Sequence, residues 1–136
     1  MKAIGLLLLL LTGATPCVFA HGNVSEKIKQ LDIKIAREPD NLQWRFQRGV
    51  NWLLNTQADH AIEDLQFVIE RDRHYPLAQL YFARAQMLDK NYKTAESAFA
   101  LALIFAQGDR EAQKETLFHR ASLRQQQQRY ADAADD

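Results

Sequence analysis

The segment Arg45-Phe46-Gln47-Arg48-Gly49 indicates the architecture of the chain, because two further versions of it follow. The later copies are Tyr81-Phe82-Ala83-Arg84-Ala85 and Leu117-Phe118-His119-Arg120-Ala121. In each copy a Phe is followed two residues later by an Arg and then by a small residue, and 36 residues separate one Phe from the next. A repeat of about this length, made of two short helices, predicts a stacked helical array.

The alanines that follow each copy leave two registers open for this repeat. Ala61 and Ala95, which open the second apolar stretches, are 34 residues apart, whereas Ala133 follows after 38 more. A constant spacing of 34 would place Ala83 opposite Gly49. We adopt the 36-residue register instead, because it aligns all three Phe residues.

Composition restricts the fold class and the kinds of partner. The chain has 136 residues, which is the length of one domain, and its net charge is zero. A neutral chain has no general attraction to nucleic acid or to anionic membranes. Gly and Pro are few (5 and 3) and good helix formers dominate, so the composition predicts an all-α protein. The single Cys excludes an intrachain disulfide.

Residues 1–20 have the layout of a secretory signal peptide. A short basic start precedes the apolar run Ala3–Leu11, and a more polar tail ends at Ala20, after which we expect cleavage. The run is shorter than the roughly 20 residues of a permanent membrane helix, so we expect no stable membrane span after cleavage. Pro16 stands where lipidation of Cys17 would need a small residue. We therefore predict an exported protein, periplasmic or secreted.

The rest of the chain divides into a half unit and two and a half helix pairs. In 21–40 we expect a capping helix that starts at Asn23, buries Ile28, Leu31 and Ile35, and ends before Pro39. Two full units follow at 41–75 and 76–109, and an incomplete third at 110–136. The expected helices cover 42–54, 60–71, 77–88, 92–106 and 111–126, with a turn at 127–129 and a new helix from Tyr130.

These units resemble tetratricopeptide repeats in the small and aromatic residues at set places of each helix pair. The matching residues are Pro39, Gly49, Trp52, Ala61, Tyr81, Ala85, Tyr92, Ala95, Phe99, Ala102, Ala121, Tyr130 and Ala133. Arg48, Arg84 and Arg120 replace the usual Leu, and Leu65, Val68 and Arg73 depart from the family pattern. The resemblance implies an α-solenoid of antiparallel helix pairs whose first helices line a concave groove.

The three Phe residues suggest what this groove could bind. With their neighbours one turn earlier and later on the same helix face, they form the candidate partner-binding set: Gln43, Phe46, Val50, Gln79, Phe82, Gln86, Glu115, Phe118 and Ser122. Aromatic steps flanked by amides suit an extended peptide or a partner's helix. Alternatively, the rings fill the seams between neighbouring helices, and the sequence leaves both interpretations open.

The periodic arginines also have two interpretations. They could form a basic ladder for a partner's carboxylates, or each could pair with a local acid such as Asp64 or Glu96. We favour local pairing.

Catalytic and cofactor chemistry has no support in the sequence. The four histidines lack metal-ligand spacing, and no Ser/His/Asp order or phosphate-binding loop occurs. We predict a non-catalytic interaction scaffold without metal or cofactor, whose partner is another protein or peptide. The alternative is an oligomerisation or accessory segment of a larger cell-envelope protein that self-associates through Glu111–Asp136, because the last unit stops early.

Overall fold

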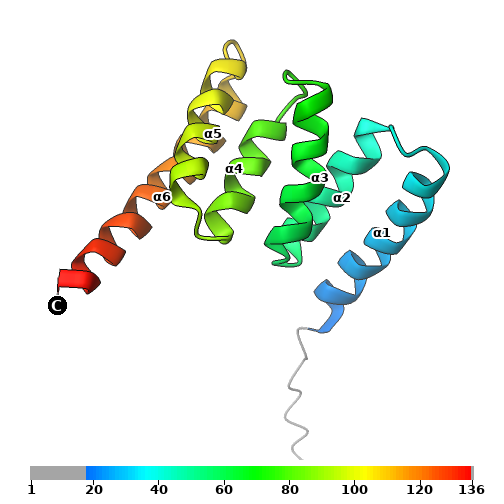
Figure 1. Cartoon of the computed structure of the whole chain (residues 1–136), viewed down its shortest axis with the longest axis horizontal. Coiled ribbons are helices and arrows are strands. Elements are labelled where there is room, and N and C mark those ends of the chain that lie inside the picture. Colours follow the sequence, from blue (N-terminus) through cyan, green and yellow to red (C-terminus); the bar gives the residue numbers. More distant parts are fainter. Residues whose placement is uncertain (1–17, 136) are drawn as a thin grey trace, which may run out of the picture.

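The computed structural model describes residues 18–135, which are all-helical (Figure 1). The helices are α1 (Val18–Arg37), α2 (Leu42–Leu54), α3 (Ala58–Arg71), α4 (Ala78–Leu88), α5 (Tyr92–Phe105) and α6 (Arg110–Asp135). Each packs against the next in chain order, with α1 at one end of the row and α6 at the other. The all-α prediction is confirmed, and α2 has the expected bounds.

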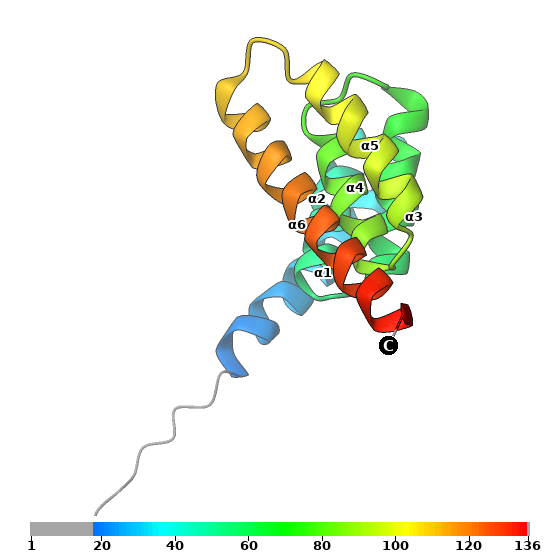
Figure 2. The same cartoon turned by 90° about the vertical axis from the view of Figure 1, so that its left-hand side faces the viewer.

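Helices α2 and α3 form one antiparallel pair, and α4 and α5 form a second (Figures 1 and 2). Both pairs turn in the same way. Thr56 and Lys90 have left-handed backbone φ angles of 59° and 63°, and the next residue donates a backbone hydrogen bond across the turn, from Gln57 to Trp52 O and from Asn91 to Gln86 O, both at 2.9 Å. This is the pattern that commonly ends an α-helix.

The two turns correct our choice of register. Thr56 and Lys90 are 34 residues apart, so the helix pairs repeat at 34 residues and not at 36. The packing agrees, because Ala83 lies in the cluster of the second pair whereas Ala85 packs on Ala61 of the preceding pair. Ala83 therefore takes the place of Gly49, as the rejected register required.

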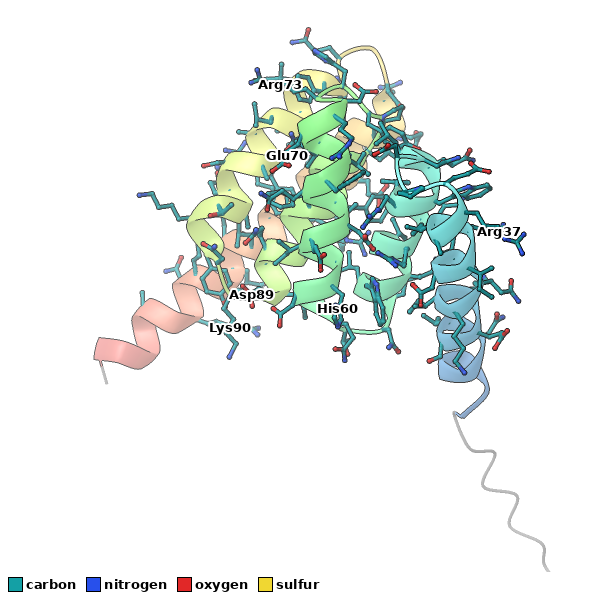
Figure 3. The ribbon with its side chains drawn as sticks, turned by 45° about the vertical axis from the view of Figure 1, so that its right-hand side comes forward. Arg37, His60, Glu70, Arg73, Asp89 and Lys90 are labelled. Atoms are coloured by element: carbon teal, nitrogen blue, oxygen red, sulfur yellow. The ribbon has the colours of Figure 1, made fainter. Side chains whose placement is uncertain are left out.

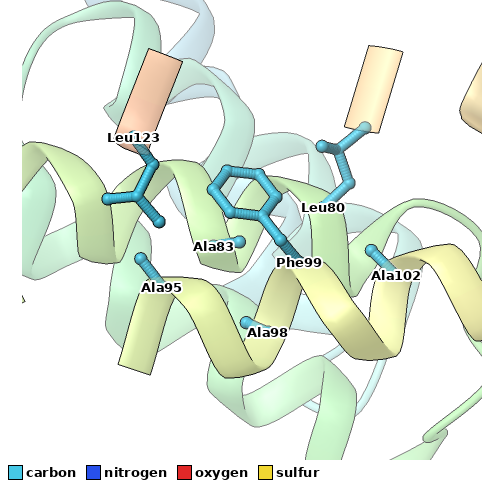
Figure 4. Close-up of a cluster of buried hydrophobic side chains, with 7 residues drawn as sticks. All are labelled: Leu80, Ala83, Ala95, Ala98, Phe99, Ala102 and Leu123. Carbon is cyan, nitrogen blue, oxygen red and sulfur yellow. The ribbon is translucent and has the colours of Figure 1, made fainter. Parts of the chain in front are cut away.

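Small residues bring the helices of each pair together. A Cβ on Gly49 would lie 2.9 Å from Leu65 Cγ, so only Gly fits at this crossing of α2 and α3. In the second pair, Ala83 and Ala95 surround the fully buried ring of Phe99, and Leu123 of α6 covers it (Figure 4). The described core thus contains two clusters, one around Phe99 and one made by Ala61, Leu65 and Ala85.

Helix α3 begins two residues earlier than expected, at Ala58, and α5 ends one residue earlier, at Phe105; three further helices also differ from expectation. Leu77 has a φ of 62°, so α4 begins at Ala78 and Pro76 lies in the connection before it. Asn23 does not cap a helix, because α1 already includes it; Ile28, Leu31 and Ile35 are buried as expected. Helix α6 continues through the turn expected at 127–129.

The predicted signal peptide falls largely outside the described residues. Residues 1–17 are not described, and Val18–Ala20 belong to the first turn of α1. Within 18–135, none of the helices combines the length and the apolar character that crossing a bilayer requires.

Candidate binding groove

The nine residues of the candidate partner-binding set do not share one surface. Phe46 lies between helix pairs, with its ring centre 5.1 Å from that of Tyr75 and 5.6 Å from that of Tyr81. Phe82 is partly buried against both core clusters. Phe118, in contrast, is 68 % exposed. The seam interpretation therefore holds for Phe46 and Phe82, and the three Phe residues are not equivalent.

The remaining members of the set range from buried to exposed. Gln79 and Gln86 are buried, and Val50 is half-buried. Gln43 is exposed in the first turn of α2, where its N–H donates to Asn41 Oδ1. Ser122 Oγ donates to a backbone oxygen of its own helix, that of Phe118.

The periodic arginines pair with local acids, as favoured from the sequence. Arg48 binds Asp64 at 2.7 Å and Asp32 at 2.6 Å, so one guanidinium joins α2 to both α3 and α1. Arg120 pairs with Glu96, and this hydrogen bond lowers the pKa of the Glu96 carboxyl. These two arginines are engaged within the chain and do not form a ladder for a partner.

Arg84, the remaining member of this row, lines an open groove of about 520 Å³. Helix α4 contributes Met87 and Leu88 to it, and α6 contributes residues from His119 onward. We call this site the groove; its full lining is Leu53, Thr56, Arg84, Met87, Leu88, Lys90, Tyr92, His119, Gln126 and Arg129. It lies at the edge of the molecule where the two turns are, next to Lys90 in Figure 3 and opposite Arg73.

The groove combines an apolar wall with positive charge. Leu53, Met87 and Leu88 supply apolar surface, and Lys90 and Arg129 supply cations. No carboxylate is among the described residues that line it. Such a surface favours a ligand that carries both apolar and acidic groups.

Glu115 does not line the groove, but it contacts two residues that do, Arg84 and His119. Glu115 accepts a long contact of 3.5 Å from Arg84 and lies 4.0 Å from His119 Nε2. Burial, and then the positive charge of Arg84, lower the pKa of the His119 imidazole. The lowered pKa disfavours the charged form of His119, and the cationic residues in the lining of the groove are Arg84, Lys90 and Arg129.

Two structural features that sequence reasoning missed build this groove. Lys90 reaches its rim because it occupies the left-handed turn position. Gln126 and Arg129 line it because α6 is continuous where we expected a turn. The large apolar residues Leu53, Met87 and Leu88 just before the two turns were the available sequence signal.

The described residues contain no candidate metal site. Within 18–135, no three His, Cys, Asp or Glu side chains come together in a way that could hold a metal ion.

Comparison with known proteins bears on the fold alone. No protein-family model matches the chain, and no curated protein sequence matches it. Among solved structures, a protein from Bordetella parapertussis, determined in solution, superposes with a TM-score of 0.64 and 24 % sequence identity. The superposition covers 73 % of this chain and 88 % of that one. The chain thus shares an all-helical fold with that protein.

Proposed function

We propose that this protein is a non-catalytic interaction module that binds an acidic, apolar segment of another protein in the groove. The observation that carries the proposal is the lining of the groove, where Met87 and Leu88 lie beside Lys90 and Arg129 without a carboxylate. A helix with a leucine stripe flanked by glutamates would bury the leucines against α4 and place its acids near these cations.

The resemblance to tetratricopeptide repeats supports this proposal. The 34-residue distance between Thr56 and Lys90 equals the repeat length of that family. Helices α2 and α4, the first helices of their pairs, both contribute to the groove, as does α6. We propose that the helix pairs are repeats of this kind and that the groove is their inner surface.

Fluorescence anisotropy with labelled amphipathic peptides tests the binding proposal. We expect a peptide with leucines on one face and glutamates beside them to bind, and the same peptide with lysines for glutamates to bind at least about tenfold more weakly. Raising the salt concentration should weaken the acidic peptide's binding, because the cations are near the surface. Equal affinity for both peptides would refute the proposal.

Matched charge reversals localise the binding. Lys90→Glu combined with Arg129→Glu should reduce affinity for the acidic peptide about tenfold or more. Lys93→Glu combined with Lys114→Glu makes the same change in net charge at exposed positions outside the groove, and should change affinity much less. If both pairs of substitutions had the same effect, the attraction would be general and not a property of the groove.

Self-association is a second candidate function, and one observation on α6 favours it. Leu117 is 53 % exposed and Phe118 is 68 % exposed, on the last helix of the row. An uncovered apolar surface at the end of a stack is where a further unit or a second copy would pack. Light scattering should then show a dimer that Leu117→Glu with Phe118→Glu converts to a monomer. A monomeric starting protein would exclude this function.

We further propose export, with cleavage after Ala20. Cleavage there would shorten α1 by three residues and leave the contacts of Ile28, Leu31 and Ile35 in place. Mass spectrometry of the protein recovered from the periplasm or the medium should give a chain that starts at His21. Recovery of the chain only inside the cell, with Met1 retained, would contradict the proposal.

A further inference from the structure

A second, more enclosed cleft lies at the opposite edge of the molecule from the groove. It has a volume of about 250 Å³ and lies between the start of α4, the end of α5 and the start of α6. Leu80, Ala102 and Phe105 supply its apolar wall. Leu80 and Ala102, which are labelled in Figure 4, belong both to the buried cluster around Phe99 and to the lining of this cleft. None of the residues that line it lines the groove.

Gln79 distinguishes this cleft from a simple packing defect. Its side chain is only 6 % exposed and lines the cleft, yet its amide forms no hydrogen bond to any described residue. Neither atom of this amide is among the fully buried side-chain atoms that lack a partner, so the amide is accessible on the side where it lines the cleft. The amide can therefore offer its NH₂ group as a donor and its C=O as an acceptor to whatever enters the cleft.

Asp109, Thr116 and His74 also line the cleft and are already engaged or exposed. Asp109 Oδ1 accepts hydrogen bonds from the N–H groups of Glu111 and Ala112 and so caps α6. Thr116 Oγ1 donates to Ala112 O at 2.7 Å. His74 is exposed and packs its ring against the edge of Phe105, with 4.6 Å between ring centres. Gln79 thus differs from these three residues, because its side chain is buried and forms no hydrogen bond within the described chain.

The charges around the cleft select against ions. No Lys or Arg is among the described residues that line it, so an anion would find no counter-charge, and Asp109 at the mouth would repel it. A cation would have to leave water for a wall made largely of Leu80, Ala102, Phe105 and Ala106. An uncharged occupant avoids both costs.

We propose that this cleft is a binding site for a small uncharged molecule with a flat apolar ring and a primary or cyclic amide. An amide of that kind presents an N–H and a C=O side by side, and these pair with the C=O and NH₂ of Gln79 in two parallel hydrogen bonds. The ring lies against Leu80 and Phe105, where it displaces water from apolar surface. This assignment is independent of the proposed partner in the groove.

Three ligands of the same size and shape test the assignment on the unaltered chain. Benzamide is neutral, benzoate is its anionic counterpart and benzamidine its cationic one. In amide NMR spectra of the ¹⁵N-labelled full chain, we expect benzamide to cause saturable shifts at residues of the cleft, such as Ala106 and Thr116. A dissociation constant of about 1 mM is typical for a ligand of about nine heavy atoms. Benzoate and benzamidine should bind at least about tenfold more weakly.

Matched substitutions of two buried glutamines in α4 then test the role of Gln79. Gln79→Met keeps the length of the side chain but removes the amide, and should weaken benzamide binding about tenfold. Gln86→Met makes the same change at an equally buried position that does not line the cleft, and should leave binding unchanged. Circular dichroism confirms that both variants fold, and the ligand series remains decisive if Gln79→Met does not.

Several results would overturn the assignment. One is the absence of saturable shifts with benzamide up to about 20 mM, well above the expected dissociation constant. Others are shifts confined to residues outside the cleft, or a charged ligand that binds as tightly as benzamide. Equal losses in Gln79→Met and Gln86→Met would show that the amide of Gln79 does not recognise the ligand.

Discussion

Asp64 of α3 is a carboxylate that is 1 % exposed and accepts hydrogen bonds from two arginines of α2. The Arg45 contact measures 3.2 Å, and the Arg48 contact 2.7 Å. The hydrogen bond to Asp64 is also the largest influence that raises the pKa of Arg48, so this guanidinium stays charged at any pH at which the protein is folded. Removing one partner of such a buried ion pair strongly lowers the free energy of unfolding, because the remaining charge is then buried without compensation.

We expect Asp64→Asn to destabilise the protein by about 3 kcal/mol, because it leaves Arg45 without its carboxylate and Arg48 with Asp32 alone at a mostly buried site. Urea unfolding at pH 7 measures the loss. The matched control is Glu63→Gln, the exposed neighbour on the same helix, which should change the free energy of unfolding by less than about 0.5 kcal/mol. Similar values for the two variants would mean that the Asp64 pair contributes little.

His119 makes stability depend on pH in a defined direction. Burial lowers the pKa of the folded imidazole below its ordinary value of 6.5, whereas the unfolded chain titrates near that value. The unfolded state therefore binds the proton first as the pH falls, and stability decreases from pH 6.5 down to the lower folded pKa. The lowered pKa of Glu96 acts in a separate window, at and below about pH 4.5.

The His119→Gln variant isolates this contribution. We expect the natural chain to lose stability between pH 7.5 and 5.5, and the variant to lose less, because a glutamine at this position binds no proton. The slope cannot exceed about 1.4 kcal/mol per pH unit for one proton. Parallel stability curves for the two chains over this range would contradict the assignment.

At the scale of the helical elements, the turn residues Thr56 and Lys90 hold conformations that ordinarily favour Gly. A side chain in the left-handed region costs about 1–2 kcal/mol, and Thr is β-branched as well. We therefore expect Thr56→Gly to stabilise the protein by about 0.5–1 kcal/mol, after the greater freedom of Gly in the unfolded chain is counted. Thermal melts measure the change.

The neighbour Asn55 provides the control for this substitution. Its φ of −87° suits any residue, so Asn55→Gly should destabilise the protein by about 0.5–1 kcal/mol. The two adjacent substitutions should thus have opposite signs. A loss of stability in both would show that the left-handed geometry of Thr56 is not strained.

These turns also explain why the sequence predicted the helices but not their register. Composition and apolar spacing were sufficient for α2, α3 and α5, whose bounds differ from expectation by two residues or fewer. We chose the 36-residue alignment because it superposes the three Phe residues. Their environments are not equivalent, since Phe82 packs in a helix seam whereas Phe118 is exposed. Backbone geometry at Thr56 and Lys90 sets the 34-residue repeat, and neither residue type signals a left-handed position.

Helix α6 shows a second limit of sequence reasoning. We expected it to end near Gln126 because the first two pairs turn at that distance. Its residues 110–135 contain no Gly or Pro, and glutamine is a good helix former, so nothing local stops the helix. Arg129 consequently lines the groove, and a site that depends on this continuity could not be found by counting repeats.

At the scale of the whole molecule, Leu123 connects α6 to the rest of the core. It is fully buried against the cluster that contains Phe99. We expect Leu123→Ala to cost about 3 kcal/mol, the usual result of truncating a buried Leu. Tryptophan fluorescence reports the unfolding of α2, which is distant from α6 in the row of helices, because Trp44 and Trp52 both lie in α2. If the helices unfold together, the fluorescence midpoint in urea should fall as much as the midpoint from circular dichroism.

The exposed Leu117 on the same helix provides the control. Leu117→Ala removes the same atoms from a half-exposed position and should change stability by less than about 1 kcal/mol. A fluorescence midpoint that stays constant in Leu123→Ala while the circular dichroism midpoint falls would show that the helix pairs unfold separately, as a chain of nearest-neighbour contacts allows.

Helix α1 has a neighbour on one side only, since it packs against α2 and no other described helix. Besides its three buried apolar residues, it is held by the ion pair between Asp32 and Arg48 and by Lys34 over the ring of Trp44. Asp32 is half-exposed, so salt screens its pair with Arg48 far more than it screens the buried pair of Asp64. Amide hydrogens of α1 should consequently exchange with deuterium before those of α3, and added salt should hasten exchange in α1 alone.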